Sequence, residues 1–232
     1  MKSKVLVITG TTDIITDFST GELPFKAVFD TTFKSKLNYA NRHGYDFLSL
    51  NGFGSDKSGR YSDTQIGYLR MIKVFNMIED YNFVMWVDAD ALITNVNMVV
   101  EDFLIDDSIF YCSYDWCGKH SLNTGNFILK NTPYTKLFMD IFYEISKSSN
   151  LPEEQATINA MYSIPTLKPS IKVLEHKFLN AVPPVNIIKP EVWNRKPTPA
   201  VPWQQGDFLL HATGLPNSER VRIFNEHFKE YL

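Results

Sequence analysis

Five unbroken apolar residues, Phe83 to Val87, run directly into the acidic triplet Asp88-Ala89-Asp90. Such a run is typical of a strand covered on both faces, in the middle of a sheet between layers of helices. More apolar sequence, Ala91-Leu92-Ile93, follows the triplet. Two carboxylates between apolar segments need a partner, because burying an unpaired charge is costly. The pattern therefore predicts an α/β fold with a charged site at the end of its central strand.

Strands and helices alternate along the rest of the chain. Apolar runs predict strands at 4–9, 46–50, 109–112, 126–129 and 207–211. Apolar stripes at helical spacing predict a helix at about 29–43 that stops at His43-Gly44, and a second helix at 62–80. Further helices are predicted after Thr132-Pro133, at Pro152-Glu153 and, on the surface, at 218–232. Glycines predict a loop at 51–60. We expect one domain over residues 1–232, with a mostly parallel, Rossmann-like central sheet flanked by helices.

Charge and cysteine content exclude several classes of protein. The chain has 23 Lys and Arg residues against 26 Asp and Glu residues, so its net charge of -3 offers no broad attraction for nucleic acid or anionic lipid. Two cysteines are too few for a disulfide framework or a four-cysteine zinc site. The apolar run near the N-terminus is too short for a signal peptide or a membrane span. We expect no nucleic-acid partner and no membrane span in this chain.

Asp88, Asp90 and His211 are the candidate metal ligands. Two carboxylates one residue apart at a strand end can reach one hard cation and its bound phosphates. An Asp-x-Asp pair alone also occurs in solvated turns, and a structural histidine is the alternative for His211. As a third ligand, the imidazole would favour Mn²⁺ over Mg²⁺. The sequence predicts a Mn²⁺ or Mg²⁺ site at these three residues.

Other polar segments follow strands or lie on helices. Thr9-Gly10-Thr11 ends the first strand, where ligand-binding loops are found. Asn123-Thr124-Gly125 offers amides and a hydroxyl that suit sugar hydroxyls, although a turn has the same composition. Arg220 and Arg222 could neutralise a diphosphate or lie exposed on a terminal helix, and a surface ion pair is the usual fate of a residue such as Arg70.

Taken in order, these segments resemble the retaining glycosyltransferase family that contains plant xyloglucan xylosyltransferases, galactomannan galactosyltransferases and fungal Golgi alpha-mannosyltransferases. The 122–131 segment is similar to the family's Leu-Asn-Thr-Gly-Ser-Phe-Leu-Leu-Arg-Asn sequence, and 83–90 to its Trp-x-Asp-x-Asp strand. Lys36 to Ala40 is similar to its early helix, Glu154-Gln155-Ala156 to its Asp-Gln-Ser helix, and His211 to Gly214 to its His-x-x-Gly.

The resemblance implies a single GT-A domain with a small additional sheet, and a retaining transfer of galactose, or else xylose or mannose, to an oligosaccharide or glycoprotein glycan. It implies a nucleotide-sugar donor, UDP-linked rather than GDP-linked, with Mn²⁺ or Mg²⁺ held by Asp88, Asp90 and His211. It places Glu154 and Gln155 near the anomeric carbon as catalytic residues. The remaining donor contacts that it implies are at Thr9, Gly10, Thr11, Asn38, Arg70, Ala89, Asn123, Thr124, Gly125 and Gly214.

The chain also departs from the family pattern. Plant members carry a lysine two residues after the glycine of His-x-x-Gly, where this chain has Pro216, so Arg220, Arg222 or Arg70 would replace it. The acid of the Asp-Gln pair is Glu154, one methylene longer. Without the anchor and stem of the Golgi members, we expect a bacterial or virus-encoded cytoplasmic enzyme, or a soluble excised domain. A sugar nucleotidyltransferase and a degenerate glycan-binding module remain as alternatives.

Overall fold

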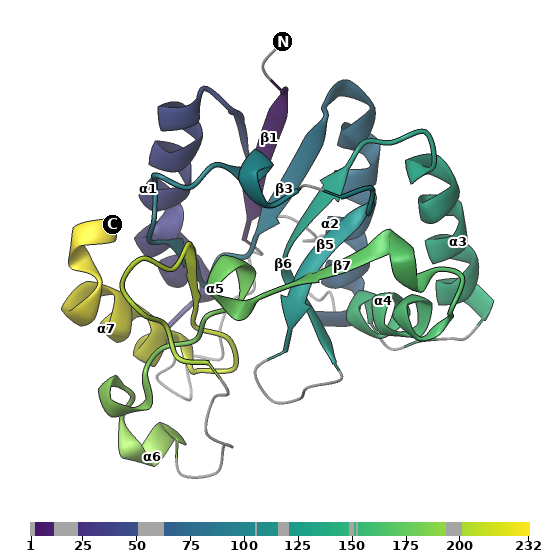
Figure 1. Cartoon of the computed structure of the whole chain (residues 1–232). Helices are drawn as coiled ribbons and strands as arrows, with labels where there is room; N and C mark the ends of the chain where they lie inside the picture. The colour runs from purple at the N-terminus through teal and green to yellow at the C-terminus, as the bar shows by residue number, and fades with distance from the viewer. Residues whose placement is uncertain are drawn as a thin grey trace, which may run out of the picture.

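The central sheet forms the frame of the molecule (Figure 1). The computed structural model describes residues 3–11, 23–50, 63–104, 106–115, 121–148, 151, 153–193 and 201–232, so the predicted loop at 51–60 lies outside it. In this part of the chain six strands pair in the order β2-β1-β3-β6-β5-β7. They are β1 (Val5–Gly10), β2 (Asp46–Leu50), β3 (Phe83–Val87), β5 (Phe110–Tyr114), β6 (Leu122–Lys130) and β7 (Ile171–Leu174).

Of these six strands, only β6 runs against the others. β1 is parallel to β2 and β3, and β5 is parallel to β7, whereas β6 is antiparallel to both β3 and β5. The carboxyl ends of β1, β3, β5 and β7 therefore lie at one edge of the sheet, together with the first residues of β6. This is the edge where α/β sheets bind ligands. The predicted α/β class with a mostly parallel sheet is confirmed.

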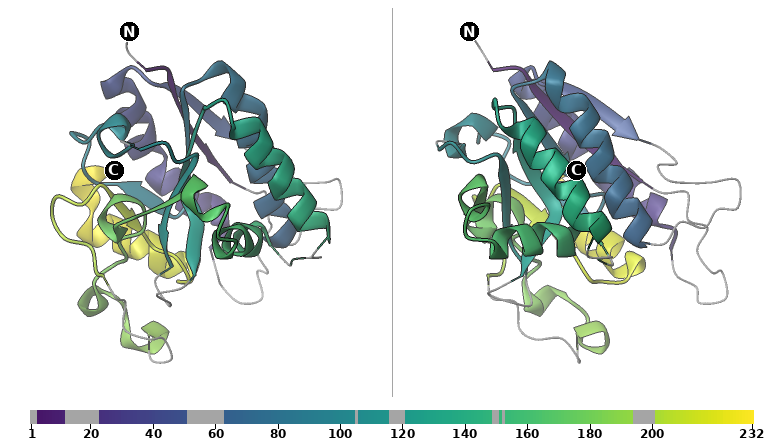
Figure 2. Two further views of the ribbon diagram at one scale, coloured as in Figure 1. Left: turned by 45° about the vertical axis from the view of Figure 1, so that its right-hand side comes forward. Right: turned by 90° about the vertical axis from the view of Figure 1, so that its right-hand side faces the viewer.

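Helices cover both faces of the sheet (Figure 2). Successive side chains of β1 point to opposite faces, as in any strand. Leu6 and Ile8 join the core beneath α2 (Asp63–Met77), α3 (Thr135–Ser148) and α4 (Glu154–Ser163). Val5 and Val7 join a second core that includes side chains of α1 (Phe25–His43) and α5 (His176–Leu179). Both faces of the strand are buried, which explains its continuous apolar sequence.

The remaining elements are short. They are α6 (Pro190–Trp193), α7 (Asn217–His227) and the 3-10 turns η2 (Ile78–Asp80), η3 (Val100–Phe103), η4 (Lys168–Ser170), η5 (Val185–Ile187) and η6 (Lys229–Tyr231). α1 ends where predicted, because Gly44 adopts a left-handed φ of 64° and its N–H bonds the last helical carbonyls. Within the described ranges, no helix is both long enough and apolar enough to cross a membrane.

A second, two-stranded sheet joins segments that lie far apart in the sequence. β4 (Ala91–Ile93) pairs antiparallel with β8 (Leu209–His211), so that Ala91 faces His211. The small additional sheet agrees with the prediction, but a strand at 91–93 was missed because three apolar residues show no period. α7 buries Ile223 and Phe224 in a core shared with this sheet and α1. The helix predicted at 218–232 is confirmed over Asn217–His227, but one of its faces is buried.

Candidate active site

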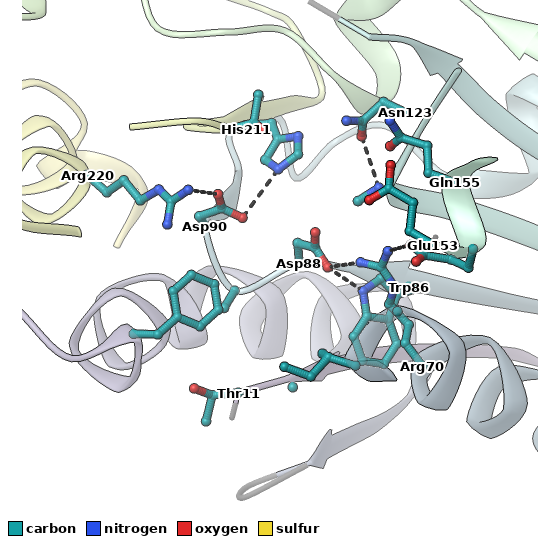
Figure 3. Close-up of a pocket in the computed structure, with 18 of the residues that line it drawn as sticks. Thr11, Arg70, Trp86, Asp88, Asp90, Asn123, Glu153, Gln155, His211 and Arg220 are labelled. Atoms are coloured by element: carbon teal, nitrogen blue, oxygen red, sulfur yellow. Dashed lines mark hydrogen bonds and ion pairs between the residues drawn. The ribbon is translucent and has the colours of Figure 1, made fainter. Parts of the chain in front are cut away.

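A cavity of about 560 Å³ opens at the carboxyl edge of the central sheet. Its walls come from the ends of β1, β3 and β8, the start of β6, the start of α4, and from α2 and α7. Figure 3 shows Arg220 and Asp90 on one side, and Arg70 and Gln155 on the other. A concave site of this size with a few convergent polar groups is typical of a small-molecule binding pocket.

Three candidate metal ligands meet in this cavity. One ligand atom from each of Asp88, Asp90 and His211 lies within 4.8 Å of the other two. The pairing of β4 with β8 brings His211 beside the acidic turn that follows β3. Gly125 permits the close approach, since a Cβ there would lie 2.7 Å from both Asp88 Oδ2 and His211 Cε1. Two carboxylates and an imidazole in this compact arrangement fit a divalent cation.

Asp90 is buried between two partners. Its Oδ2 lies 3.0 Å from Arg220 Nη2, and its Oδ1 lies 3.3 Å from His211 Nε2. Burial acts to raise the pKa of Asp90, but the positive charge of Arg220, followed by the interactions with neighbouring His211, outweighs it and holds the pKa well below the usual range. Asp90 is therefore ionised at neutral pH and can act as a charged ligand.

The Asp88 carboxylate is oriented by two donors on the same oxygen. Arg70 Nη1 and Trp86 Nε1 each donate to Oδ1 at 2.6 Å. The guanidinium of Arg70 also lies 5.7 Å from the centre of the Trp86 ring, a cation–π arrangement. Because both donors bond Oδ1, the other oxygen, Oδ2, is the one directed toward Gly125 and His211. The pair thus presents Oδ2 to a ligand in the cavity.

Glu154 and Gln155 enter the cavity from the start of α4. Glu154 is 4% exposed, and its Oε1 pairs with Arg70 Nη2 and accepts a hydrogen bond of 3.0 Å from Thr124 Oγ1. Gln155 Oε1 accepts from the backbone N–H of Thr124 at 3.2 Å. A Cβ on Gly67 would overlap the Glu154 carboxylate, so the glycine in α2 makes room for it. Glu154 is therefore a fixed, buried charge rather than a solvated acid at a helix start.

Lys36 lies fully buried beneath the acidic turn. Its Nζ donates to Thr32 Oγ1 at 2.8 Å and to the Ala89 carbonyl at 3.3 Å, and the Thr32 hydroxyl donates to the same carbonyl at 2.6 Å. Burial lowers the pKa of Lys36 to about 7, although the charges of Asp90 and Asp88 oppose this shift. Through these bonds α1 fixes the peptide that joins the two candidate ligands.

The lowered pKa of Lys36 predicts a pH-dependent stability. Between about pH 7 and 10.5 the unfolded chain holds a proton on this amine that the folded chain releases, so the free energy of unfolding rises with pH. We expect the free energy of unfolding of the wild type to rise relative to that of Lys36→Met by up to about 1.4 kcal/mol per pH unit in this window. Urea unfolding of both proteins with chelator at several pH values measures it. A difference that stays constant from pH 7 to 10 would contradict the burial of a titrating amine.

Comparison with known sequences decides the family. The sequence profile of the galactosyl transferase GMA12/MNN10 family matches residues 1–111 and 106–221, which together span most of the chain. The chain belongs to this family. It is therefore a member of a glycosyltransferase family. The match favours sugar transfer over the nucleotidyltransferase and glycan-binding alternatives.

Curated members of the family are distant relatives. An uncharacterized alpha-1,2-galactosyltransferase of Schizosaccharomyces pombe is 22% identical over 82% of this chain and 57% of its own length. Galactomannan galactosyltransferase 1 of Cyamopsis tetragonoloba is 27% identical over 52% of this chain and 28% of its own. The probable alpha-1,6-mannosyltransferase MNN10 of Saccharomyces cerevisiae is 25% identical over 68% and 49%. The chain thus spans between about a quarter and three fifths of the length of these relatives.

Solved structures establish the GT-A fold. A glycosyltransferase involved in glycosylation of the major capsid of PBCV-1 superposes with a TM-score of 0.66 at 16% identity, covering 96% of this chain and 98% of its own. The galactosyltransferase LgtC superposes with a TM-score of 0.58 at 11% identity, covering 90% and 87%. At these identities the similarity concerns the fold alone. It confirms the GT-A architecture that the sequence resemblance implied.

The cavity collects most of the residues expected from the family resemblance. Those that line it are Gly10, Thr11, Arg70, Asp88, Ala89, Asp90, Asn123, Gly125, Glu154, Gln155 and His211. Thr124 lies behind this lining and holds the two α4 side chains. Asn123, Thr124 and Gly125 are inside β6, so the alternative of a turn at this segment was wrong.

Besides Thr124, three expected donor contacts are not part of the cavity lining. Asn38 is exposed on α1 and does not line the cavity, so its contact with the donor stays a prediction. It follows Lys36 by two residues, about 200° around the helix, so it faces away from the acidic turn. Thr9 is buried within the fold, and Gly214 is exposed in a left-handed turn with φ 67° before α7. For Gly214 the backbone geometry of the turn explains the glycine.

The structure also separates the three candidate arginines. Arg220 lies one helical turn after Pro216, lines the cavity and contacts Asp90. Arg222 instead pairs with Glu219 and Glu226 and lies outside the cavity lining. Neither is the freely exposed arginine that a terminal surface helix would carry. Of the two, Arg220 is the cation positioned to reach an anion in the cavity.

Several site residues were missed by sequence reasoning. Lys36, Thr32, Gly67 and Asn180 support the ligands without carrying a recognisable motif. Lys36 did leave a signal, since it occupies the helix stripe marked by apolar Phe29 and Ala40, and a lysine in such a stripe needs a buried partner. The others act through contacts between distant segments and have no local signature.

Proposed function

We propose that the chain is a metal-dependent, retaining glycosyltransferase that moves a sugar, galactose as first candidate, from a UDP-sugar to a hydroxyl of an oligosaccharide or glycoprotein glycan. The observation that carries the proposal is the Asp88, Asp90 and His211 cluster, which lies in one cavity with Arg220 and Gln155. Xylose and mannose donors are the other candidates. The chain spans only part of the length of these relatives, so its activity is proposed here and not transferred from them.

The donor diphosphate is the group that this cluster suits. A divalent cation held by Asp88, Asp90 and His211 would neutralise the diphosphate and make the nucleotide a better leaving group. Arg220 lies 3.0 Å from Asp90 and adds a fixed positive charge, in place of the lysine that Pro216 replaces. Gly10 and Thr11, at the end of β1, are the residues proposed to hold the nucleoside.

The α4 residues are proposed to act at the anomeric carbon. In a retaining transfer the bond from this carbon to the phosphate oxygen breaks, the acceptor oxygen bonds on the same face, and the acceptor proton passes to the leaving diphosphate. Gln155 Oε1 is held by Thr124, which leaves its amide nitrogen to contact the sugar. Glu154, fixed by Arg70 and Thr124, would stabilise developing positive charge electrostatically.

A donor screen tests the proposal. Purified protein is incubated with UDP-galactose, UDP-xylose, UDP-glucose or GDP-mannose and Mn²⁺, and both thermal stabilisation and donor hydrolysis are measured. We expect the largest effect with UDP-galactose, and loss of that effect with chelator. Hydrolysis that is equal with and without Mn²⁺ would reject metal dependence, and a GDP-mannose preference would reject the donor assignment.

A further inference from the structure

Asn180 lies directly behind His211 on the side away from Asp90. It is fully buried, and its Oδ1 lies 2.7 Å from His211 Nδ1. Backbone hydrogen bonds hold this pair in register. The Asn180 N–H donates to the His176 carbonyl, and the His211 N–H donates to the carbonyl of Ala181, the residue after Asn180. The contact therefore results from the pairing of the segment after α5 with β8.

A second hydrogen bond fixes which way the Asn180 amide points. Its Nδ2 donates to the carbonyl of Tyr114 at the end of β5, at 2.8 Å. A carbonyl oxygen can only accept, so the amide nitrogen must face Tyr114 and the amide oxygen must face the imidazole. Oδ1 in turn can only accept, so His211 must carry a proton on Nδ1.

This leaves Nε2 of His211 as the atom that faces the cavity. It lies 3.3 Å from Asp90 Oδ1, and both atoms offer electron pairs when the imidazole is neutral. Two such atoms repel each other unless a positive charge lies between them, either a proton on Nε2 or a metal ion that replaces it. The opposite tautomer would direct an N–H at Asp90 and leave no lone pair on Nε2 for a metal.

We propose that Asn180 is a positioning residue that sets the tautomer of His211 and so determines whether this histidine can bind the metal. The proposal rests on the metal site of the proposed function and extends it to a residue outside the cavity lining. Partners of metal-bound histidines typically change metal affinity by about 10- to 100-fold when they are removed.

Two substitutions separate the two bonds of Asn180. Asn180→Leu removes both the acceptor for His211 and the donor to Tyr114. Asn180→Asp keeps an acceptor for His211 Nδ1 but loses the donor to Tyr114. If Asn180 acts through His211, the leucine variant should lose metal affinity and the aspartate variant should largely keep it. If its role is limited to packing against Tyr114, both variants should change metal affinity alike.

The experiment reads the tautomer directly in metal-free protein. With ¹⁵N-labelled histidine, long-range proton–nitrogen spectra distinguish protonated Nδ1 from protonated Nε2, and His211→Gln assigns the His211 signals. We expect protonated Nδ1 in the wild type and in Asn180→Asp, and a mixed or inverted tautomer in Asn180→Leu. The other histidines act as internal controls for the fold and should keep their shifts.

Mn²⁺ titration followed by electron paramagnetic resonance completes the test. We expect Asn180→Leu to weaken Mn²⁺ binding about 10- to 100-fold and Asn180→Asp to stay within a few-fold of wild type. An unprotonated Nδ1 on wild-type His211 would overturn the proposal even if the leucine variant failed to fold. Equal loss of affinity in the two variants would also overturn it. A wild type with protonated Nδ1 that binds no Mn²⁺ would reject the metal site and, with it, the metal-binding role of Asn180.

Discussion

Asp90→Asn is expected to lower the catalytic efficiency of sugar transfer by about 10³-fold or more, because it removes a charged ligand at the point where diphosphate charge must be stabilised. The amide keeps the shape of the side chain, so the change tests charge. In the wild type the Arg220 guanidinium lies 3.0 Å from the Asp90 carboxylate, and the substitution removes this partner. Losing one member of a buried ion pair costs about 3–5 kcal/mol of stability. Initial rates across a Mn²⁺ titration measure the first effect, and thermal unfolding measures the second.

Asp106→Asn is the matched control for this substitution. Asp106 pairs with Lys172 at 2.9 Å and accepts a hydrogen bond from Tyr111, and these contacts hold its pKa at about 2 even though burial opposes the shift. It does not line the cavity. The control should lose stability but keep its transfer rate and Mn²⁺ dependence. An Asp90→Asn enzyme with more than a tenth of wild-type efficiency would contradict the assignment of Asp90 as a ligand.

The positions of the main strands could be predicted because burial on both faces leaves a readable pattern. β3 was predicted with its observed bounds, and β2 likewise, since polar residues or glycine flank each run. β6 was predicted only over 126–129, because its first half is Leu-Asn-Thr-Gly, which is polar where it enters the cavity. The polar residues that form the site therefore interrupt the apolar pattern from which the first half of this strand would have been predicted.

The core of the site could be predicted, but its supports could not. Asp88, Asp90 and His211 were expected together because each follows an apolar run, and the structure brings them within reach of one ion. Their pairing depends on β4, which is too short to show a period. Asn180 and Thr32 act through single contacts across the fold, and nothing in their neighbouring sequence identifies those partners.

Arg70→Met is expected to cost both stability and activity, because Arg70 is the cation between the buried Glu154 carboxylate and the partly buried Asp88 carboxylate. It contacts Asp88 at 2.6 Å and pairs with Glu154, and its own side chain is only 12% exposed. Without it the two carboxylates would repel each other with no cation between them. We expect a loss of about 3–5 kcal/mol in the free energy of unfolding. Since Trp86 alone would then orient Asp88, we also expect the turnover number to fall by about two orders of magnitude.

The double variant Arg70→Met/Glu154→Gln distinguishes charge balance from orientation. Neutralising Glu154 removes one of the two unpaired charges, so part of the lost stability should return, and the non-additivity measures the coupling. Activity should not return, because Asp88 is still missing the Arg70 donor and Glu154 has lost its charge. Arg222→Met is the control, since it breaks pairs with Glu219 and Glu226 outside the cavity lining. It should be destabilised and retain wild-type turnover. If the double variant regained activity together with stability, Arg70 would serve only to balance charge, and its proposed orientation of Asp88 would be wrong.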